Sequence, residues 1–323
     1  MMTSLIFTLS AVLLVAPLFP AGPPDTPHGA VKLLVGGQYQ EAARLLETLL
    51  RDADVNHVST EMKAALYTNL GTAYHKLGRN SDAEKVLSKS VRLWIELGWT
   101  SRLEYGISLN NLGDALLAEK FYGKSEGMFQ DALAVFRALP EPPKQEIAVA
   151  LNNLAMIAQS ARRWREAEDY YRNAVETLRG PSGSSTGQFA GILNNLGFLY
   201  KEQKRFAEAR DLYSQALTIW QTNLPPTHPD IAFALHNLGV LEMELNQLGE
   251  AEAHLQQALE LSASLPPEHP MFSAIYDAYA ALMKKTGRKQ EAKQLEASAR
   301  ASRTRHNQAN YGNTVVDVRT LLR

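Results

Sequence analysis

One tetrapeptide recurs along this chain at an unbroken spacing of 42 residues, and this repetition limits what the chain can fold into. Each copy reads Asn-Asn-Leu-Gly or differs from it at one position. The copies begin at Thr68, Asn110, Asn152, Asn194 and His236. A fixed period of this length predicts one supersecondary unit that is used many times and buries its apolar face against its neighbours.

Apolar residues around each copy recur every three or four positions, which indicates an amphipathic helix. A short polar turn and a second helix follow, and small residues form two columns in that second helix. Small residues let two helices cross closely, and a large residue beside them fills the remaining space. The first column is Ala42, Ala83, Ser125, Ala167, Ala209, Ala251 and Ala292, the second is Ser90, Ala132, Ala174, Ala216, Ala258 and Ala299, and the large residues are Leu87, Phe129, Tyr171, Tyr213 and Leu255. The pattern predicts an all-α chain of antiparallel helix pairs.

Four segments follow from these patterns. We expect a hydrophobic N-terminal segment over residues 1–22, a clipped first helical pair over 23–58, the repeat array over 59–302 and a C-terminal tail over 303–323. Proline-rich turns separate the later units, and His228-Pro229-Asp230 and His269-Pro270 read as helix starts. The last helix is expected to span about 289–302, and residues 314–318 are β-prone.

The N-terminal segment predicts export. Leu5 to Phe19 is almost wholly apolar, but it is shorter than the ~20 residues that a spanning helix needs. Ala21-Gly22 supplies small residues near a cleavage point, as in a secretory signal, so we expect a periplasmic or extracellular protein. No Lys or Arg precedes Lys32, and Phe19 lies where a small residue is preferred. An uncleaved membrane anchor therefore remains an alternative.

Composition excludes several classes of site. The chain has no cysteine, so disulfides, thiolate metal sites and cysteine nucleophiles are ruled out. With 33 basic and 34 acidic residues there is no bulk positive field for nucleic acid. The eight histidines show no metal-ligand spacing, and no catalytic or phosphate-loop motif occurs. We therefore expect no enzymatic activity, no metal and no cofactor.

The columns and their spacing resemble the tetratricopeptide repeat, and the 42-residue period resembles the longer variant found in kinesin light chains. The resemblance covers about residues 24–302. It implies a right-handed superhelical solenoid of antiparallel helix pairs with about six to seven units. Ser90 and Ser125 in the alanine columns and Glu242 at an apolar position depart from the family pattern.

The resemblance also implies a binding surface, because the first helices of such units line the concave face of the superhelix. The asparagines expected there are Asn69, Asn111, Asn153, Asn195 and Asn237. A ladder of amides can hold an extended peptide backbone with little regard for its sequence. The alternative is that the amides brace neighbouring helices, and one amide could serve both roles.

Residues beside the ladder complete the predicted peptide-binding face. Asn110, Asn152 and Asn194 precede ladder positions, and Phe198 and Lys201 lie one or two turns onward on the same side. Only Lys76 and Lys201 could act in a carboxylate clamp, and they are several units apart, so we expect a groove of mixed amide and apolar contacts. For Phe198 and Met156, burial against the adjacent helix is the alternative.

These observations predict a non-catalytic scaffold that holds a peptide segment or partner protein in the concave groove. The alternative is a structural subunit that self-assembles, or docks onto a complex that could be membrane-associated, through its ends or convex face. The degenerate last unit and the tail motivate this alternative. The partner's identity and the oligomeric state do not follow from the sequence.

Overall fold

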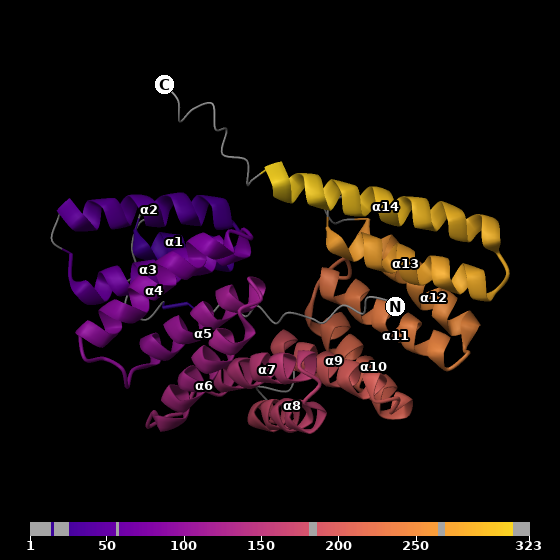
Figure 1. The fold of residues 1–323 in the computed structure, drawn as a ribbon, viewed down its shortest axis with the longest axis horizontal. Helices are drawn as coiled ribbons and strands as arrows, with labels where there is room; N and C mark the ends of the chain where they lie inside the picture. Colours follow the sequence, from indigo (N-terminus) through magenta and orange to yellow (C-terminus); the bar gives the residue numbers. More distant parts are fainter. Residues whose placement is uncertain (1–13, 16–25, 56–57, 181–185, 264–268, 313–323) are drawn as a thin grey trace. The chain divides into compact units, whose positions relative to one another are not determined.

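The structure is a computed structural model that describes residues 14–15, 26–55, 58–180, 186–263 and 269–312. Within these residues the chain forms fourteen α-helices and no strand (Figure 1). The helices are α1 (Pro27–Val35), α2 (Tyr39–Val55), α3 (Thr60–Lys76), α4 (Asn80–Glu96), α5 (Leu103–Ala118), α6 (Tyr122–Ala138), α7 (Lys144–Ser160), α8 (Trp164–Leu178), α9 (Gly187–Glu202), α10 (Phe206–Asn223), α11 (Pro229–Glu244), α12 (Leu248–Ser262), α13 (Pro270–Lys285) and α14 (Lys289–Gly312).

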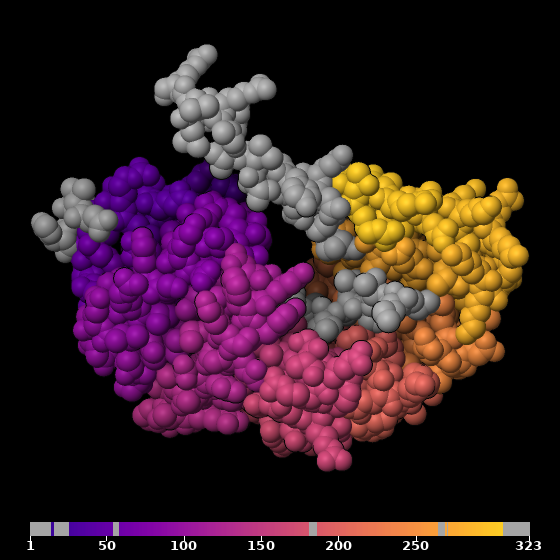
Figure 2. Space-filling view, viewed as in Figure 1, coloured from indigo at the N-terminus to yellow at the C-terminus, as the bar shows by residue number. Residues whose placement is uncertain are grey.

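Consecutive helices pack as pairs, from α1 with α2 to α13 with α14, which confirms the predicted all-α, paired-helix architecture. The chain divides into two compact units, one containing α1–α8 and the other α9–α14. Within each unit the pairs follow one another in sequence order, from indigo to magenta in the first and from red to yellow in the second (Figure 2).

The small columns pack as the sequence predicts. Every member of both columns is fully buried, and so are the five large residues beside them. The glycine of the repeated tetrapeptide meets the large residue of the second helix. A Cβ on Gly113 would lie 2.7 Å from Phe129 Cε1, and one on Gly71 would lie 2.3 Å from Leu87 Cγ. The absence of a side chain at these positions therefore sets how closely the two helices of a pair approach.

The three departures from the family pattern each have a polar partner. Ser90 Oγ lies 2.7 Å from Thr68 Oγ1 and donates to the Ala64 carbonyl at 2.8 Å. Ser125 Oγ donates to the Gly113 carbonyl at 2.8 Å. Glu242 Oε2 lies 2.8 Å from His254 Nδ1. A buried polar group is tolerated when it is hydrogen-bonded, so these substitutions keep the packing of each pair.

The turn inside each pair repeats its backbone conformation as well. Gly78 lies at φ 73°, in the left-handed region that glycine adopts freely. Lys120, Arg162, Lys204 and Asn246 occupy the same position at successive intervals of 42 residues, with φ between 58° and 66°. The left-handed conformation costs a non-glycine residue about 1–2 kcal/mol. The geometry of the pair therefore dictates the turn even where glycine is missing.

Both predicted His-Pro helix starts are confirmed. His228 Nδ1 accepts a hydrogen bond from the Asp230 backbone N–H at 3.3 Å, and His269 Nδ1 accepts one from the Met271 N–H at 3.3 Å. The rings thus cap α11 and α13, and Pro229 and Pro270 lie in the first turns. The last helix differs from our expectation, because α14 continues past Ser302 to Gly312. The β-prone stretch 314–318 lies outside the described residues.

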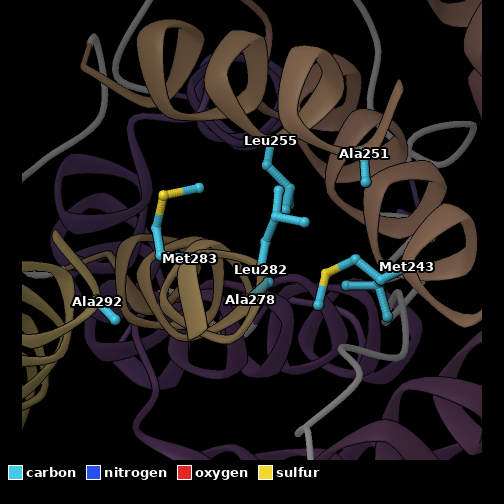
Figure 3. Packing of buried hydrophobic residues seen from close by; sticks show 8 residues of the cluster. Met243, Ala251, Leu255, Ala278, Leu282, Met283 and Ala292 are labelled. Carbon is cyan, nitrogen blue, oxygen red and sulfur yellow. The ribbon is translucent and has the colours of Figure 1, made fainter. Parts of the chain in front are cut away.

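The hydrophobic core continues into the degenerate last pair. Leu255 of α12 and Leu282 of α13 point toward one another, with Met243 of α11 and Met283 beside them (Figure 3). Ala292 of α14 is fully buried in the same cluster. Methionine fills irregular gaps well, which suits the end of the array, where the repeat pattern weakens.

We predict that Gly113→Ala lowers the free energy of unfolding of the α1–α8 unit by about 1–2 kcal/mol. The added methyl group would clash with the rigid ring of Phe129, an overpacking cost of about 1–3 kcal/mol that the better helix propensity of alanine offsets only in part. Urea unfolding followed by circular dichroism measures the change.

The matched control is Gly127→Ala in α6, where nothing lies within 4 Å of the added Cβ. This variant should gain up to about 1 kcal/mol from helix propensity alone. Equal effects of the two substitutions would contradict the close-packing argument.

Candidate functional site

The first helices of successive pairs form a continuous face in each unit. α1, α3, α5 and α7 contact one another in succession, and so do α9, α11 and α13. We call the face in each unit its first-helix face. The predicted ladder lies on its helices: Asn69 on α3, Asn111 on α5, Asn153 on α7, Asn195 on α9 and Asn237 on α11. All five asparagines are at most 6% exposed, so their amides lie among protein atoms.

Two ladder amides brace neighbouring first helices. Asn111 Nδ2 on α5 donates to Thr72 Oγ1 on α3 at 3.0 Å. Asn153 Nδ2 on α7 donates to Asp114 Oδ1 on α5 at 2.8 Å. Thr72 and Asp114 each lie three residues after a ladder asparagine, so both bonds join equivalent positions of adjacent units. The bracing alternative is therefore observed at these two steps.

The ladder bonds differently in the second unit. Asn237 Nδ2 on α11 donates to Asn194 Oδ1 on α9 at 3.0 Å. The position on α9 that corresponds to Thr72 and Asp114 is Phe198, which offers no polar group. The amide of Asn237 consequently bonds the asparagine that precedes the ladder. Bracing persists, but with a different acceptor.

Asn69, the first member of the ladder, binds a backbone instead of a neighbouring side chain. Its Oδ1 accepts a hydrogen bond from the Val15 N–H at 3.1 Å, and its Nδ2 donates to the Val15 carbonyl at 3.5 Å. Val15 is fully buried, and the two residues are 54 positions apart in the chain. One side-chain amide thus provides hydrogen-bond partners for both the N–H and the carbonyl of a single residue. A neighbouring β-strand would provide the same two partners.

The residues that precede the ladder are buried too. Asn152 Nδ2 donates to Asn153 Oδ1 at 3.3 Å and contacts Met156 Sδ at 3.5 Å. Both amide atoms of Asn110 and the Nδ2 of Asn194 have no hydrogen-bond partner among the described residues. Leaving a buried polar atom unpaired costs about 1–3 kcal/mol. Their complete burial favours packing between helices over contact with a peptide.

His236, at the same position of α11, is buried and stays neutral at physiological pH. Burial, together with the smaller effect of the nearby positive charge of Lys201, lowers the pKa of His236 to about 4. Lys201 is itself largely buried: its ammonium lies 4.7 Å from the centroid of the Phe198 ring and 3.6 Å from Glu202 Oε1. Burial lowers the pKa of Lys201 as well. Phe198 and Met156 are 7% and 8% exposed, as the burial alternative predicted.

Sequence reasoning missed the acidic member of the face, Asp114. Burial raises the pKa of the Asp114 carboxyl to about 7, although the charge of Lys76 opposes this shift. Burial lowers the pKa of Lys76 to about 8, and the charge of Asp114 opposes that shift in turn. The signal available in the sequence was the polar residue three positions after the ladder asparagine, which occurs only at Thr72 and Asp114.

The described residues contain no cluster of metal-ligand side chains. No group of three or more His, Cys, Asp or Glu side chains there could hold a metal ion. The buried hydroxyl cluster of Thr68, Ser90 and Ser108 bonds to hydroxyls, backbone carbonyls and the Trp94 indole, and has no basic partner in those contacts. Across the same residues, no helix is long and apolar enough to cross a membrane. Apart from Leu14 and Val15, the predicted export segment lies outside the described residues.

Comparison with known families agrees with the repeated helix pairs seen in the structure. Two family models described as tetratricopeptide repeat match the chain, one at residues 104–180, 188–264 and 230–305 and the other at 30–97 and 152–223. No curated protein sequence matches significantly.

Solved structures share the fold at low sequence identity. BtubC (BKLC) from P. vanneervenii is 22% identical with a TM-score of 0.60, and the match covers 69% of this chain and 91% of that one. A Podosopora anserina putative kinesin light chain with nearly identical TPR-like repeats is 21% identical with a TM-score of 0.53, covering 65% and 98%. The apo form of RapI is 12% identical with a TM-score of 0.66, covering 87% and 97%.

We predict that Asp114→Asn stabilises the α1–α8 unit increasingly as the pH rises from 4 to 7. The folded pKa of Asp114 lies above its ordinary value of 3.8, so the unfolded state binds fewer protons in this window and the wild type loses stability as the pH rises. The variant removes that loss, and its amide oxygen can still accept from Asn153. We expect equal melting temperatures near pH 4 and a gain of about 2–4 °C at pH 7.5, on the order of 1 kcal/mol.

The control for loss of one negative charge is Asp169→Asn, at an exposed position of α8. The difference in melting temperature between this variant and wild type should not grow as the pH rises. A constant difference in melting temperature between Asp114→Asn and wild type from pH 4 to 8 would contradict the raised pKa of Asp114.

Proposed function

Since this chain belongs to the tetratricopeptide repeat family and carries kinesin-light-chain-like repeats, we propose that it is a non-catalytic scaffold that binds an extended segment of a partner protein on its first-helix face. The family supports a role in protein–protein interaction. The charge balance of 33 basic and 34 acidic residues gives no support for nucleic acid as the partner.

The observation that carries the proposal is the pair of hydrogen bonds between the Asn69 side chain and the backbone of Val15. An amide that bonds N–H and C=O of one residue holds an extended chain without reading its side chains. The bracing bonds of Asn111 and Asn153 keep the adjacent helices in register beside this contact. A rigid face of this kind lowers the ordering cost of binding.

The side chains around the ladder give the expected character of the partner. Lys76 has the carboxyl group of Asp114 nearby, and Lys201 is paired with Glu202. These positions favour a mixed amide and apolar surface over a clamp for a terminal carboxylate. We therefore propose a partner segment held mainly through its backbone and uncharged side chains.

A peptide-display selection on the immobilised full-length protein tests the proposal. Peptides selected against wild type are then measured against a variant that combines Asn69→Ala, Asn111→Ala and Asn153→Ala, which all lie in the α1–α8 unit. Loss of all three amide contacts should weaken binding at least tenfold, since each hydrogen bond contributes about 0.5–1.5 kcal/mol and 1.4 kcal/mol corresponds to a factor of about ten.

The matched control is Asn173→Ala, at an exposed position of the second helix α8. Circular dichroism establishes that each variant keeps its helices. If the selected peptides bind the triple variant and wild type equally well, the ladder is not the binding surface and the proposal fails.

We further propose export through the segment Leu5 to Phe19, with an uncleaved anchor as the alternative. N-terminal sequencing of protein recovered from the cell envelope and from the medium should find a new N-terminus close to Gly22. Intact Met1 on cytosolic protein would contradict export, and intact Met1 on membrane-bound protein would favour the anchor. The self-assembly hypothesis concerns residues 313–323 in part, which lie outside the described residues, and it stays a prediction.

A further inference from the structure

We propose that the segment of this chain around Leu14 and Val15 is an intramolecular ligand of Asn69, and that it masks this end of the first-helix face until the segment leaves. The inference rests on the proposed function, because it concerns the same face. It adds the chemical class of the ligand, an uncharged apolar strand, and a regulatory consequence.

The geometry of the contact is that of a bound peptide. Asn69 engages both backbone groups of Val15, at 3.1 Å from the N–H and 3.5 Å from the carbonyl. Val15 is fully buried, and Leu14 is half-buried. The described backbone at these two residues is neither helix nor strand, and the Asn69 side chain supplies hydrogen-bond partners for the N–H and the carbonyl of Val15.

The position of Asn69 at the end of the ladder explains why this amide is available. Asn111 and Asn153 donate to the polar residue three positions after the preceding ladder asparagine. The residue on α1 that is equivalent to Thr72 is Ala30 for a repeat of 42 residues, or Val31 for the shorter first repeat. Neither has a polar side chain. Asn69 therefore has no brace acceptor on the preceding first helix, and it bonds the backbone of Val15 instead.

The sequence around Val15 defines the ligand class. Residues 5–19 contain no charged side chain, and apolar residues dominate them. A fully buried position would penalise a carboxylate or ammonium by several kcal/mol. The site should accordingly accept extended, uncharged, apolar segments and reject the same segments with an acidic residue at the position of Val15.

Tethering strengthens the self-contact. Residues 16–26 join Val15 to the start of α1, and a short connection of this kind gives an effective concentration on the order of 1 mM. A free peptide with a Kd of about 100 µM would then bind the masked chain roughly tenfold more weakly than the unmasked one. If export removes residues 1–22, removal of the segment would also open the site.

The test uses the full chain and a fluorescein-labelled probe peptide of residues 10–20, extended by two lysines for solubility. The variant Val15→Asp places a carboxylate at the buried position and should expel the tethered segment. Fluorescence anisotropy should show the probe binding Val15→Asp at least tenfold more tightly than wild type. Circular dichroism and the melting temperature establish that both proteins are folded.

A double-mutant cycle identifies Asn69 as the group that binds the probe. In the Val15→Asp background, Asn69→Ala should weaken the binding of the probe peptide at least fivefold. Asn173→Ala should leave the affinity for the probe unchanged. Methylation of the probe's nitrogen at the residue equivalent to Val15 removes the N–H that donates to Asn69 Oδ1. This methylation should weaken binding to the protein that keeps Asn69 and have little further effect on Asn69→Ala.

Three results would overturn the inference: equal binding of the probe to wild type and Val15→Asp, no binding to either, or additive effects of methylation and Asn69→Ala. Each is separate from the proposed function. If display-selected peptides still depend on the ladder while the probe fails, the scaffold proposal stands and the masking inference falls. If both assays fail, both are wrong.

Discussion

The close crossing of the two helices within each pair is the constraint on which the rest of the structure depends. Gly113 faces the ring of Phe129, and Gly71 faces Leu87, at distances that leave no room for a methyl group. A core at crystal-like density cannot absorb a larger residue without moving a helix. The small columns, the left-handed turns and the 42-residue spacing recur from pair to pair and permit this close approach.

The fixed crossing places equivalent positions of successive first helices opposite one another, and the amide ladder follows from it. The ladder is nevertheless not uniform. The residue three positions after each asparagine is polar at Thr72 and Asp114 and apolar at Phe198, so the amides find different acceptors. Asn69 has no such acceptor on α1 and bonds the backbone of Val15. Repeats with the same structure therefore differ in the chemistry that their first helices present.

Burial also shifts the pKa values of two ionisable groups on the first helices. Burial brings the pKa of Asp114 to about 7 and that of Lys76 to about 8, so both groups change charge near neutral pH. Asp114 lies on α5, where it accepts the bracing hydrogen bond of Asn153, and Lys76 lies on α3. Elsewhere His254, whose pKa the Glu242 carboxylate raises, supports α12 against α11. Its stabilisation is complete below pH 6.5 and is lost as the pH rises through the raised pKa.

The sequence by itself determined the helix pairs, the buried columns and the capped helix starts, because local spacing and side-chain size decide them. It also predicted which asparagines share a face. Only the tertiary structure decided what each asparagine does, since partners 39 to 54 residues apart leave no local pattern. The roles of Asp114 and Thr72, the burial of Asn110 and Asn194, and the pairing of Asn69 with Val15 all depend on neighbours supplied by other helices or by the N-terminal segment. A periodic sequence specifies the scaffold through repeated packing, whereas the exceptions that distinguish one repeat from the next acquire their meaning only when the helices are assembled.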